Sequence, residues 1–308
     1  MADLFTPLTI GGRGLPNRIA MAPGPCGATN PDGFVSDEAL AYYTRRASGG
    51  VGLIITEALR VTPPEEALCT VHLGIYADAF VPRLRRLVTA IRVYGARVIF
   101  TLDDPPPPAL APIATLQVCI EAFAFAAWRA HCAGADGVML TSADGGLLYS
   151  LLSPLHNQRD DAYGESSQGR QRMAIEIIEA IRRWLGTRLI IGFRLLADEF
   201  TPGGLTLQDA RMLAKRLTAA GVHLLDVTTP DTSTNVASFP GWSLPLANSI
   251  KRVVDVPVIG SGDLGDPLLV DSAIRDRSVD LIMLDQTLRL DPDWPIKARV
   301  TLDDADDG

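Results

Sequence analysis

The sequence predicts a single α/β domain folded as a TIM-type (β/α)8 barrel. Eight short apolar runs, rich in Val, Ile and Leu, are spread along the 308 residues, and amphipathic stretches alternate with them. This length fits one barrel domain. A doubly wound open sheet is the alternative architecture, but it would more naturally carry a G-x-G-x-x-G turn after its first strand, and the sequence has none there.

The apolar runs are predicted to be parallel strands. They are short and almost continuously apolar, as strands covered by helices on one side and packed inside a barrel on the other must be. In chain order they cover residues 18–22, 51–56, 97–102, 137–141, 189–194, 223–228, 256–260 and 281–284.

The stretches between these runs are predicted to contain helices. Apolar residues recur every three to four positions in 37–48, 80–94, 116–133, 171–185 and 207–220. Thr206 and Asp209 have the spacing of a capping box, and Gly134, Gly186 and Gly221 stand where helices should end. We expect the barrel to cover residues 1–300 and residues 301–308 to form a solvated acidic tail.

Charge and hydropathy limit the expected partners. The net charge is −8, from 28 Lys and Arg against 36 Asp and Glu, which argues against a nucleic acid or an anionic membrane as a partner. No apolar run reaches the roughly 18 residues that a membrane span needs. The first residues, Met-Ala-Asp-Leu-Phe, lack the pattern of a signal peptide, so we expect a cytoplasmic protein.

The carboxyl ends of the strands form the working face of such a barrel. Acidic side chains dominate the residues expected there, among them Glu57, Asp104, Asp144 and Asp285, and Arg194 is the only cation expected. Carboxylates in a partly apolar mouth can have raised pKa values and donate protons near neutral pH. Asp104, Asp144 and Glu57 are therefore candidate general acids or bases.

Several segments resemble one known family in the order expected along the chain. Residues 137–148 read Gly-Val-Met-Leu-Thr-Ser-Ala-Asp-Gly-Gly-Leu-Leu, and residues 152–164 read Leu-Ser-Pro-Leu-His-Asn-Gln-Arg-Asp-Asp-Ala-Tyr-Gly. Together they are similar to the signature of the old yellow enzyme family, flavin-dependent barrel oxidoreductases. Residues 4–23, 42–57 and 290–295 resemble other segments of that family, so the resemblance covers nearly the whole chain and implies the barrel fold.

The resemblance implies FMN at the top of the barrel, but several expected contacts differ. Arg194 stands at the position of the Arg that faces the flavin N1 and O2 edge, and Ala58 is also retained. Thr101 replaces the Gln that bonds the ring, and Pro25 replaces a Thr or Cys and lacks a backbone donor. If FMN is retained, the resemblance places it against Pro23, Ala58, Thr101, Arg194, Gly262 and Gln286.

The phosphate contacts implied by the resemblance are altered most. A glycine-rich turn persists at Gly262, but the family's Gly-Arg pair is replaced by Asp285 and Gln286. A lost charge-assisted bond costs roughly 1.5–3 kcal/mol. A carboxylate about 5 Å from the phosphate adds roughly 3 kcal/mol of repulsion at an effective dielectric of about 20. We therefore expect FMN binding to be weakened by several orders of magnitude.

The substrate contacts also differ. Thr141 and Asp144 stand where the family has its substrate-binding His and His/Asn, and Gly146 stands where it has a proton-donating Tyr. Thr141 can donate one weak hydrogen bond, whereas an ionised Asp144 would repel a carbonyl oxygen.

These substitutions favour a flavin-independent enzyme that performs redox-neutral acid–base chemistry, an isomerisation or cyclisation, on a conjugated carbonyl compound. Asp104, Asp144, Thr141, Arg194 and Glu57 would form its active site, with no cofactor favoured. One alternative is an FMN-dependent NAD(P)H oxidoreductase with altered contacts, and another is a non-catalytic barrel that binds a ligand or partner. No metal site is predicted, because the spacing of the acids matches no metal-binding loop. The family often forms dimers or tetramers, so a homo-oligomer is the expected assembly.

Overall fold

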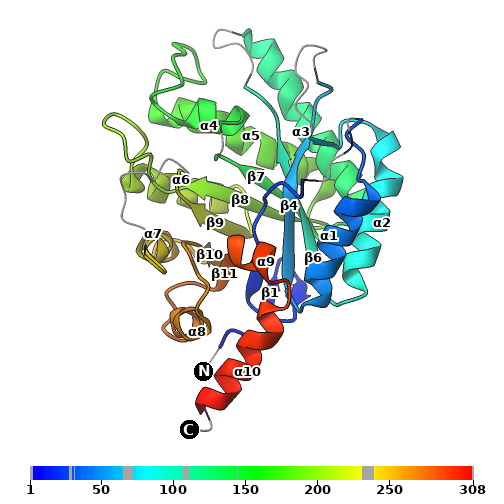
Figure 1. Ribbon diagram of the computed structural model, residues 1–308. Coiled ribbons are helices and arrows are strands. Elements are labelled where there is room, and N and C mark those ends of the chain that lie inside the picture. The colour runs from blue at the N-terminus through cyan, green and yellow to red at the C-terminus, as the bar shows by residue number, and fades with distance from the viewer. Residues whose placement is uncertain are drawn as a thin grey trace.

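The computed structural model describes residues 3–27, 30, 32–64, 72–106, 111–143, 145–230 and 239–306. Eight parallel strands in this part of the chain close into a barrel with helices around it, which confirms the predicted fold (Figure 1). Closure comes from the pairing of β3 with both β11 and β4. Around the barrel, the hydrogen-bonded neighbours are β3 (Ile19–Met21), β4 (Leu53–Arg60), β6 (Arg97–Asp103), β7 (Gly137–Thr141), β8 (Ile190–Leu196), β9 (Leu224–Thr228), β10 (Val258–Gly260) and β11 (Leu281–Leu284).

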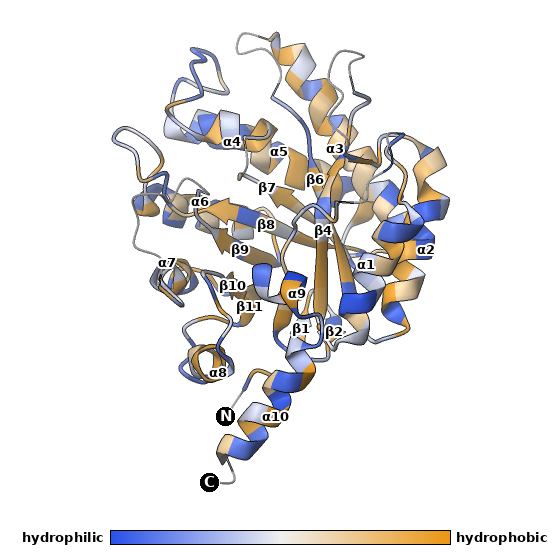
Figure 2. Cartoon of the chain, in the orientation of Figure 1, coloured by the Kyte–Doolittle hydropathy of each residue, from blue (hydrophilic) through white to orange (hydrophobic). Residues whose placement is uncertain are grey.

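A short hairpin plugs the amino end of the barrel. β1 (Leu8–Ile10) pairs antiparallel with β2 (Arg13–Leu15), and Ile10 and Leu15 pack into the same apolar cluster as the inward-facing residues of the strands. That inner cluster includes Leu53, Ile99 and Met139. In Figure 2 the strands are accordingly the most continuously hydrophobic part of the molecule. With one end plugged, the opposite end, where the strands finish, is left for polar side chains.

The predicted helices are confirmed. Their bounds are α1 (Asp37–Ser48), α2 (Val81–Arg92), α3 (Ile113–Ala133), α5 (Ser167–Leu185) and α6 (Leu207–Ala219), and the capping box of Thr206 and Asp209 begins α6 as expected. Gly134 ends α3 with φ +88°, a left-handed conformation that costs glycine little. The remaining elements are β5 (Leu73–Gly74), η1 (Asp78–Phe80), α4 (Leu147–Leu152), α7 (Leu244–Lys251), α8 (Pro267–Arg275), α9 (Gln286–Leu290) and α10 (Trp294–Asp306).

The segment expected to be an acidic tail is helical for most of its length. α10 continues through it to Asp306, because Leu302 is buried and anchors this turn against the apolar cluster around the barrel, while Asp303 and Asp304 are exposed. The structure thus places the first part of residues 301–308 on the body of the protein.

One described helix, α3, is long and apolar enough to cross a membrane by length and composition alone. It lies in the ring of helices around the barrel, where Phe123 and Ala127 are fully buried. A helix that packs on a barrel core passes the same test, so α3 is weak evidence for a membrane.

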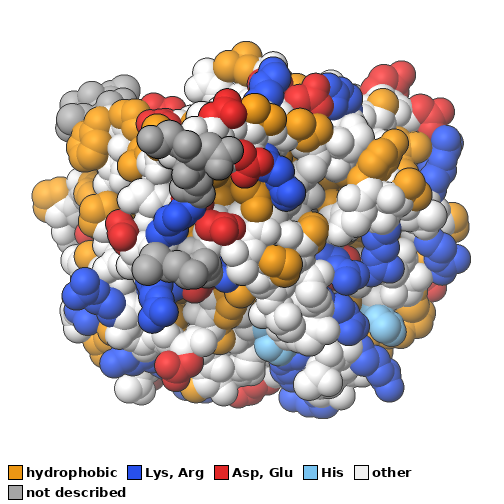
Figure 3. Space-filling view, turned by 90° about the horizontal axis from the view of Figure 1, so that it is seen from below, with side chains coloured by type: hydrophobic (Ala, Val, Ile, Leu, Met, Phe, Trp, Pro, Cys, Tyr) orange, Lys and Arg blue, Asp and Glu red, His pale blue; other side chains and the backbone are white. Residues whose placement is uncertain are grey.

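The face in Figure 3 carries Lys and Arg as well as Asp and Glu side chains, so both charge signs are mixed on it despite the net charge of −8.

Candidate active site at the barrel mouth

The ends of the strands carry more positive charge than the sequence predicted. β4 extends to Arg60, beyond the predicted end at residue 56, after a β-bulge between Ile55 and Ala58. Arg60 is only 9% exposed, and its Nη1 has no hydrogen-bond partner among the described residues. Arg289, on α9, lies close to the end of β11. The expectation that Arg194 is the only cation near the mouth is therefore wrong.

Arg194 is held by two residues of the neighbouring strand β9. Its Nη1 donates to Asp226 Oδ2 at 3.0 Å, and its Nη2 donates to Thr228 Oγ1 at 3.1 Å. Asp226 is completely buried and the Arg194 side chain is 17% exposed. The positive charge therefore has a protein partner and needs no anionic ligand to persist. The buried Nε of Arg194 has no hydrogen-bond partner in the described part of the chain, so one donor of the guanidinium is left unsatisfied there.

Asp104 lies in a buried polar cluster between β4 and β6. The Thr62 hydroxyl lies 2.7 and 2.8 Å from its two carboxylate oxygens and donates to this carboxylate. Burial raises the pKa of Asp104, while the hydrogen bond from Thr62 and the charge of Arg60 oppose the rise. Asp104 thus has the environment of a carboxyl group that keeps its proton more readily than an exposed one.

Glu57 and Thr101 are bound to other parts of the protein. The Tyr43 hydroxyl on α1 donates to Glu57 Oε1 at 3.4 Å and accepts from the Glu57 amide at 3.0 Å. Burial and the nearby Glu57 carboxylate raise the pKa of Tyr43 well above its usual value. The Thr101 hydroxyl donates to the carbonyl of Thr56 at 2.7 Å. This hydrogen bond links β6 to β4, and the Thr101 hydroxyl proton is therefore not available for donation to another group.

An acidic side chain, that of Asp103, lies beside the segment that follows β7. A Cβ atom at Gly146 would overlap the carboxylate of Asp103, so Asp103 occupies the space in which a side chain at 146 would begin. Thr141 Oγ1 accepts the Ala143 amide at 3.1 Å. Ser142 Oγ donates to the carbonyl of Arg194 at 3.1 Å and so links β7 to β8. Asp144 lies outside the described residues.

The turn after β10 is glycine-dependent. Gly262 has φ +110°, and a Cβ there would overlap Ser243 Oγ just before α7. The carbonyl of Gly262 accepts the Gly241 amide at 2.7 Å. Position 262 therefore has no room for a side chain between this turn and the residue before α7.

The two residues after β11 lie at the surface. Asp285 is paired with Arg289, whose Nε donates to Asp285 Oδ1 at 2.7 Å, and Gln286 begins α9. Pro23 and Ala58, at the ends of β3 and β4, are half-buried. Of the predicted site residues, the structure thus brings Arg194, Thr101 and Thr141 to adjacent strand ends, whereas the side chain of Glu57 is turned toward α1.

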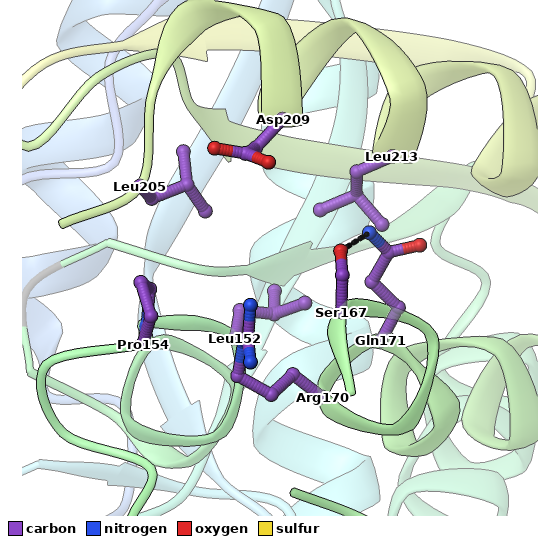
Figure 4. Close-up of a pocket in the computed structure, with 8 residues that line it drawn as sticks. All are labelled: Leu152, Pro154, Ser167, Arg170, Gln171, Leu205, Asp209 and Leu213. Atoms are coloured by element: carbon purple, nitrogen blue, oxygen red, sulfur yellow. Dashed lines mark hydrogen bonds between the residues drawn. The ribbon is translucent and has the colours of Figure 1, made fainter. Parts of the chain in front are cut away.

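Two hollows away from the mouth do not resemble an active site. One, of about 20 Å³, lies between α4, α5 and α6, beside the hydrogen bond from Gln171 to Ser167 (Figure 4). It has room for about one water molecule. A larger hollow of about 550 Å³ lies between α3 and α5, on the outside of the barrel, and Glu121, Glu176 and Glu179 line it.

Comparisons with known proteins identify the family. The sequence profile of the NADH:flavin oxidoreductase / NADH oxidase family matches residues 3–108 and 114–305. The chain belongs to this family. The match confirms the resemblance to old yellow enzymes and spans the barrel from its first strands to α10.

Individual relatives are similar over nearly the whole chain. It is 34% identical to an NADH oxidase of Thermoanaerobacter brockii, with 96% of this chain and 50% of that protein covered. It is 32% identical to an NADPH dehydrogenase of Geobacillus sp. (strain WCH70), with 96% and 93% covered. The chain spans about half the length of this NADH oxidase and of a metal reductase of Desulforamulus reducens, to which it is 32% identical.

Solved structures show the same fold. A 2-naphthoyl-CoA reductase complex superposes with a TM-score of 0.91 at 23% identity, and covers 97% of this chain and 52% of its own. Morphinone reductase in complex with tetrahydroNAD superposes with a TM-score of 0.80 at 24% identity, with 98% and 91% covered.

Two expectations from the sequence are wrong. The flavin-independent isomerase or cyclase, and the absence of a favoured cofactor, both conflict with membership of a family of flavin oxidoreductases. The physical reason lies in contacts that the sequence does not show. Arg289 offsets the charge of Asp285, so a flavin phosphate would meet an ion pair and not a bare carboxylate.

The described residues fit FMN at this mouth. Arg194 has a buried Nε donor with no partner among these residues, and Gly262 provides a turn without a side chain. Arg289 adds a cation beside the altered pair after β11. The ring contact predicted at Thr101 is the exception, because its hydroxyl already donates to Thr56.

Proposed function

We propose that this chain is an FMN-dependent oxidoreductase that takes hydride from NADH or NADPH and delivers it to a small electron-poor acceptor, such as a conjugated carbonyl compound. The observation that carries the proposal is Arg194. It stands near the end of β8, aligned by Asp226 and Thr228, and its buried Nε has no hydrogen-bond partner among the described residues. The names of the relatives, NADH oxidase and NADPH dehydrogenase, support the nicotinamide donor.

Bound FMN would supply the acceptance and donation of hydride. The chain's own contribution is to position and polarise the flavin. Arg194 would place a positive charge beside the flavin ring, and a largely buried charge stabilises negative charge nearby more than an exposed one would. Asp226 fixes the orientation of the guanidinium, and Gly262 and the residues after β11 would hold the phosphate.

The proton-donating side of the reaction is where this chain departs from its family. Gly146 has no side chain to donate a proton, and Asp103 occupies the adjacent space. Asp104 is the described carboxyl group whose pKa is raised by burial, and we propose that it holds the proton on its carboxyl oxygen for delivery at this end of the barrel. Thr62 keeps that carboxyl group in one orientation.

The test is the visible absorption spectrum of the purified protein, before and after incubation with FMN and removal of free flavin. We expect one flavin per chain, and anaerobic addition of NADH or NADPH should bleach its visible band. Arg194→Gln should weaken FMN and slow bleaching, whereas Asp37→Asn, a surface change that alters the net charge by one unit, should do neither. A colourless protein that takes up no FMN would refute the proposal. The cytoplasmic location and the homo-oligomeric state expected from the sequence stay predictions.

A further inference from the structure

We propose that Arg289 supplies the cation for the flavin phosphate in this chain, in place of the cation lost at Gln286. The inference rests on the proposed FMN-dependent function and deepens it. It assigns the phosphate contact to a residue one helical turn beyond the position at which the family carries its Arg.

The side chain of Arg289 is folded back toward the end of β11. Its Nε donates to Asp285 Oδ1 at 2.7 Å, so the guanidinium lies beside the first residue of the altered pair. Its Nη2 lies against Gly24, at the end of the adjacent strand β3. The guanidinium therefore lies above the ends of two neighbouring strands.

The terminal nitrogens of Arg289 are available to a ligand. The side chain is 39% exposed, and within the described part of the chain neither Nη1 nor Nη2 has a hydrogen-bond acceptor. Guanidinium groups donate paired N–H bonds to phosphate oxygens, which makes Arg well suited to this ligand.

The neighbourhood of Arg289 carries excess positive charge. Arg46 on α1 is buried, stacks on the Tyr42 ring with Cζ 3.5 Å from its centroid, and donates to the carbonyl of Arg289 at 3.4 Å. Within the described part of the chain, Arg289 is paired with the carboxylate of Asp285, whereas Arg46 donates only to backbone carbonyls. A phosphate would balance this corner better than Asp285 does alone, in a protein whose overall charge is −8.

Gly24 makes room for this arrangement. A Cβ atom at position 24 would overlap Arg289 Nη2, so any larger residue there would displace the guanidinium. The backbone of Gly24 does not have a positive φ, so its lack of a side chain is not explained by conformation. An ordinary surface pair four residues apart on a helix needs no such space on another strand.

The experiment compares FMN with riboflavin, which lacks the phosphate. Dissociation constants for both are measured by quenching of flavin fluorescence in the wild type, Arg289→Gln, Asp285→Asn and a control, Arg45→Gln. Arg45 also pairs with an aspartate, Asp293, at the surface, so the control loses a comparable charge. Melting temperatures establish that each variant is folded.

We expect Arg289→Gln to raise the dissociation constant of FMN roughly tenfold or more while that of riboflavin changes by less than about twofold. Asp285→Asn should have the opposite sign and tighten FMN roughly threefold to tenfold, because it removes a repulsive charge and releases Arg289. Arg45→Gln should change neither ligand.

The outcomes separate this inference from the function on which it rests. If the wild type binds FMN but Arg289→Gln binds it equally well, or loses FMN and riboflavin in the same proportion, Arg289 is not the phosphate cation and the proposed function stands. If the wild type binds neither flavin, both proposals are overturned.

Discussion

Removing the charge of Asp226 should destabilise the protein and weaken flavin binding together. Asp226 is fully buried and lies 3.0 Å from Arg194. At an effective dielectric of about 20, two unit charges at that distance attract by about 5.5 kcal/mol. Asp226→Asn keeps an oxygen that can accept from Nη1, and it recovers part of the cost of burying a carboxylate. We therefore expect a net loss of about 2–4 kcal/mol, somewhat below the cost of breaking a buried pair outright.

This loss corresponds to a fall in melting temperature of about 3–6 °C for a domain of this size. The assay is thermal unfolding followed by circular dichroism, with Asp37→Asn as the matched control. Asp37 is 69% exposed and pairs with Arg83 and Arg86 at the surface, so the same change of charge should shift the melting temperature by less than about 1 °C. If the two variants melt together, the Asp226–Arg194 pair does not stabilise the mouth, and the alignment of Arg194 needs another explanation.

Three further predictions concern the mouth and the plugged end. Gly262→Ala should lose FMN binding and stability, because φ is +110° and a Cβ would overlap Ser243; Gly95→Ala, also at positive φ but facing open space, should keep FMN affinity in the same titration. Burial raises the pKa of Asp104 above 3.8, so the stability contributed by its protonation is present below pH 3.8 and is lost as the pH rises through the raised pKa. The melting temperature of Asp104→Asn should therefore rise relative to that of the wild type from pH 3 to 7. A constant difference between the two melting temperatures would contradict this. Burial, followed by the charge of Arg182, lowers the pKa of His223 from 6.5 to about 4, so the stability contributed by neutral His223 is present above pH 6.5 and is lost as the pH falls through about 4. In His223→Gln the melting temperature should therefore depend less on pH between these values. An unchanged slope would exclude His223 as the source of the pH dependence.

The barrel could be predicted from the sequence because its strands and helices have distinct apolar periods. The strands at 137–141 and 281–284 and the helix at 37–48 match the predicted bounds residue for residue. β4 was predicted too short, since its apolar run stops at Glu57, and the bulge that lets it continue to Arg60 leaves no apolar signal. The hairpin of β1 and β2 was missed because three-residue strands are too short for a periodic pattern.

The candidate site was predicted less well than the fold. Arg194 could be named from its place at the end of a strand, but its partner Asp226 could not, because the two lie 32 residues apart and meet only when β8 and β9 pair. One signal was present: a charged residue in the middle of an apolar strand needs a buried partner. Asp226 sits within such a run, Leu-Leu-Asp-Val-Thr, at 224–228.

In two places a side chain that the family carries is missing from its motif position, and a charged residue from another position of this chain lies beside the gap. After β7, the missing side chain of Gly146 is accompanied by Asp103 at the end of the neighbouring strand β6, which fills the space. After β11, the missing cation at Gln286 is accompanied by Arg289 one turn later and by the small residue Gly24 that accommodates it. In both places a glycine makes room for a charged group from another position. The two changes differ in consequence, because Arg289 restores the charge that a phosphate needs, whereas Asp103 replaces a neutral proton donor with a carboxylate. We therefore expect the chain to keep the family's affinity for FMN, while its turnover of conjugated carbonyl acceptors is slower than in relatives that carry a neutral proton donor at position 146.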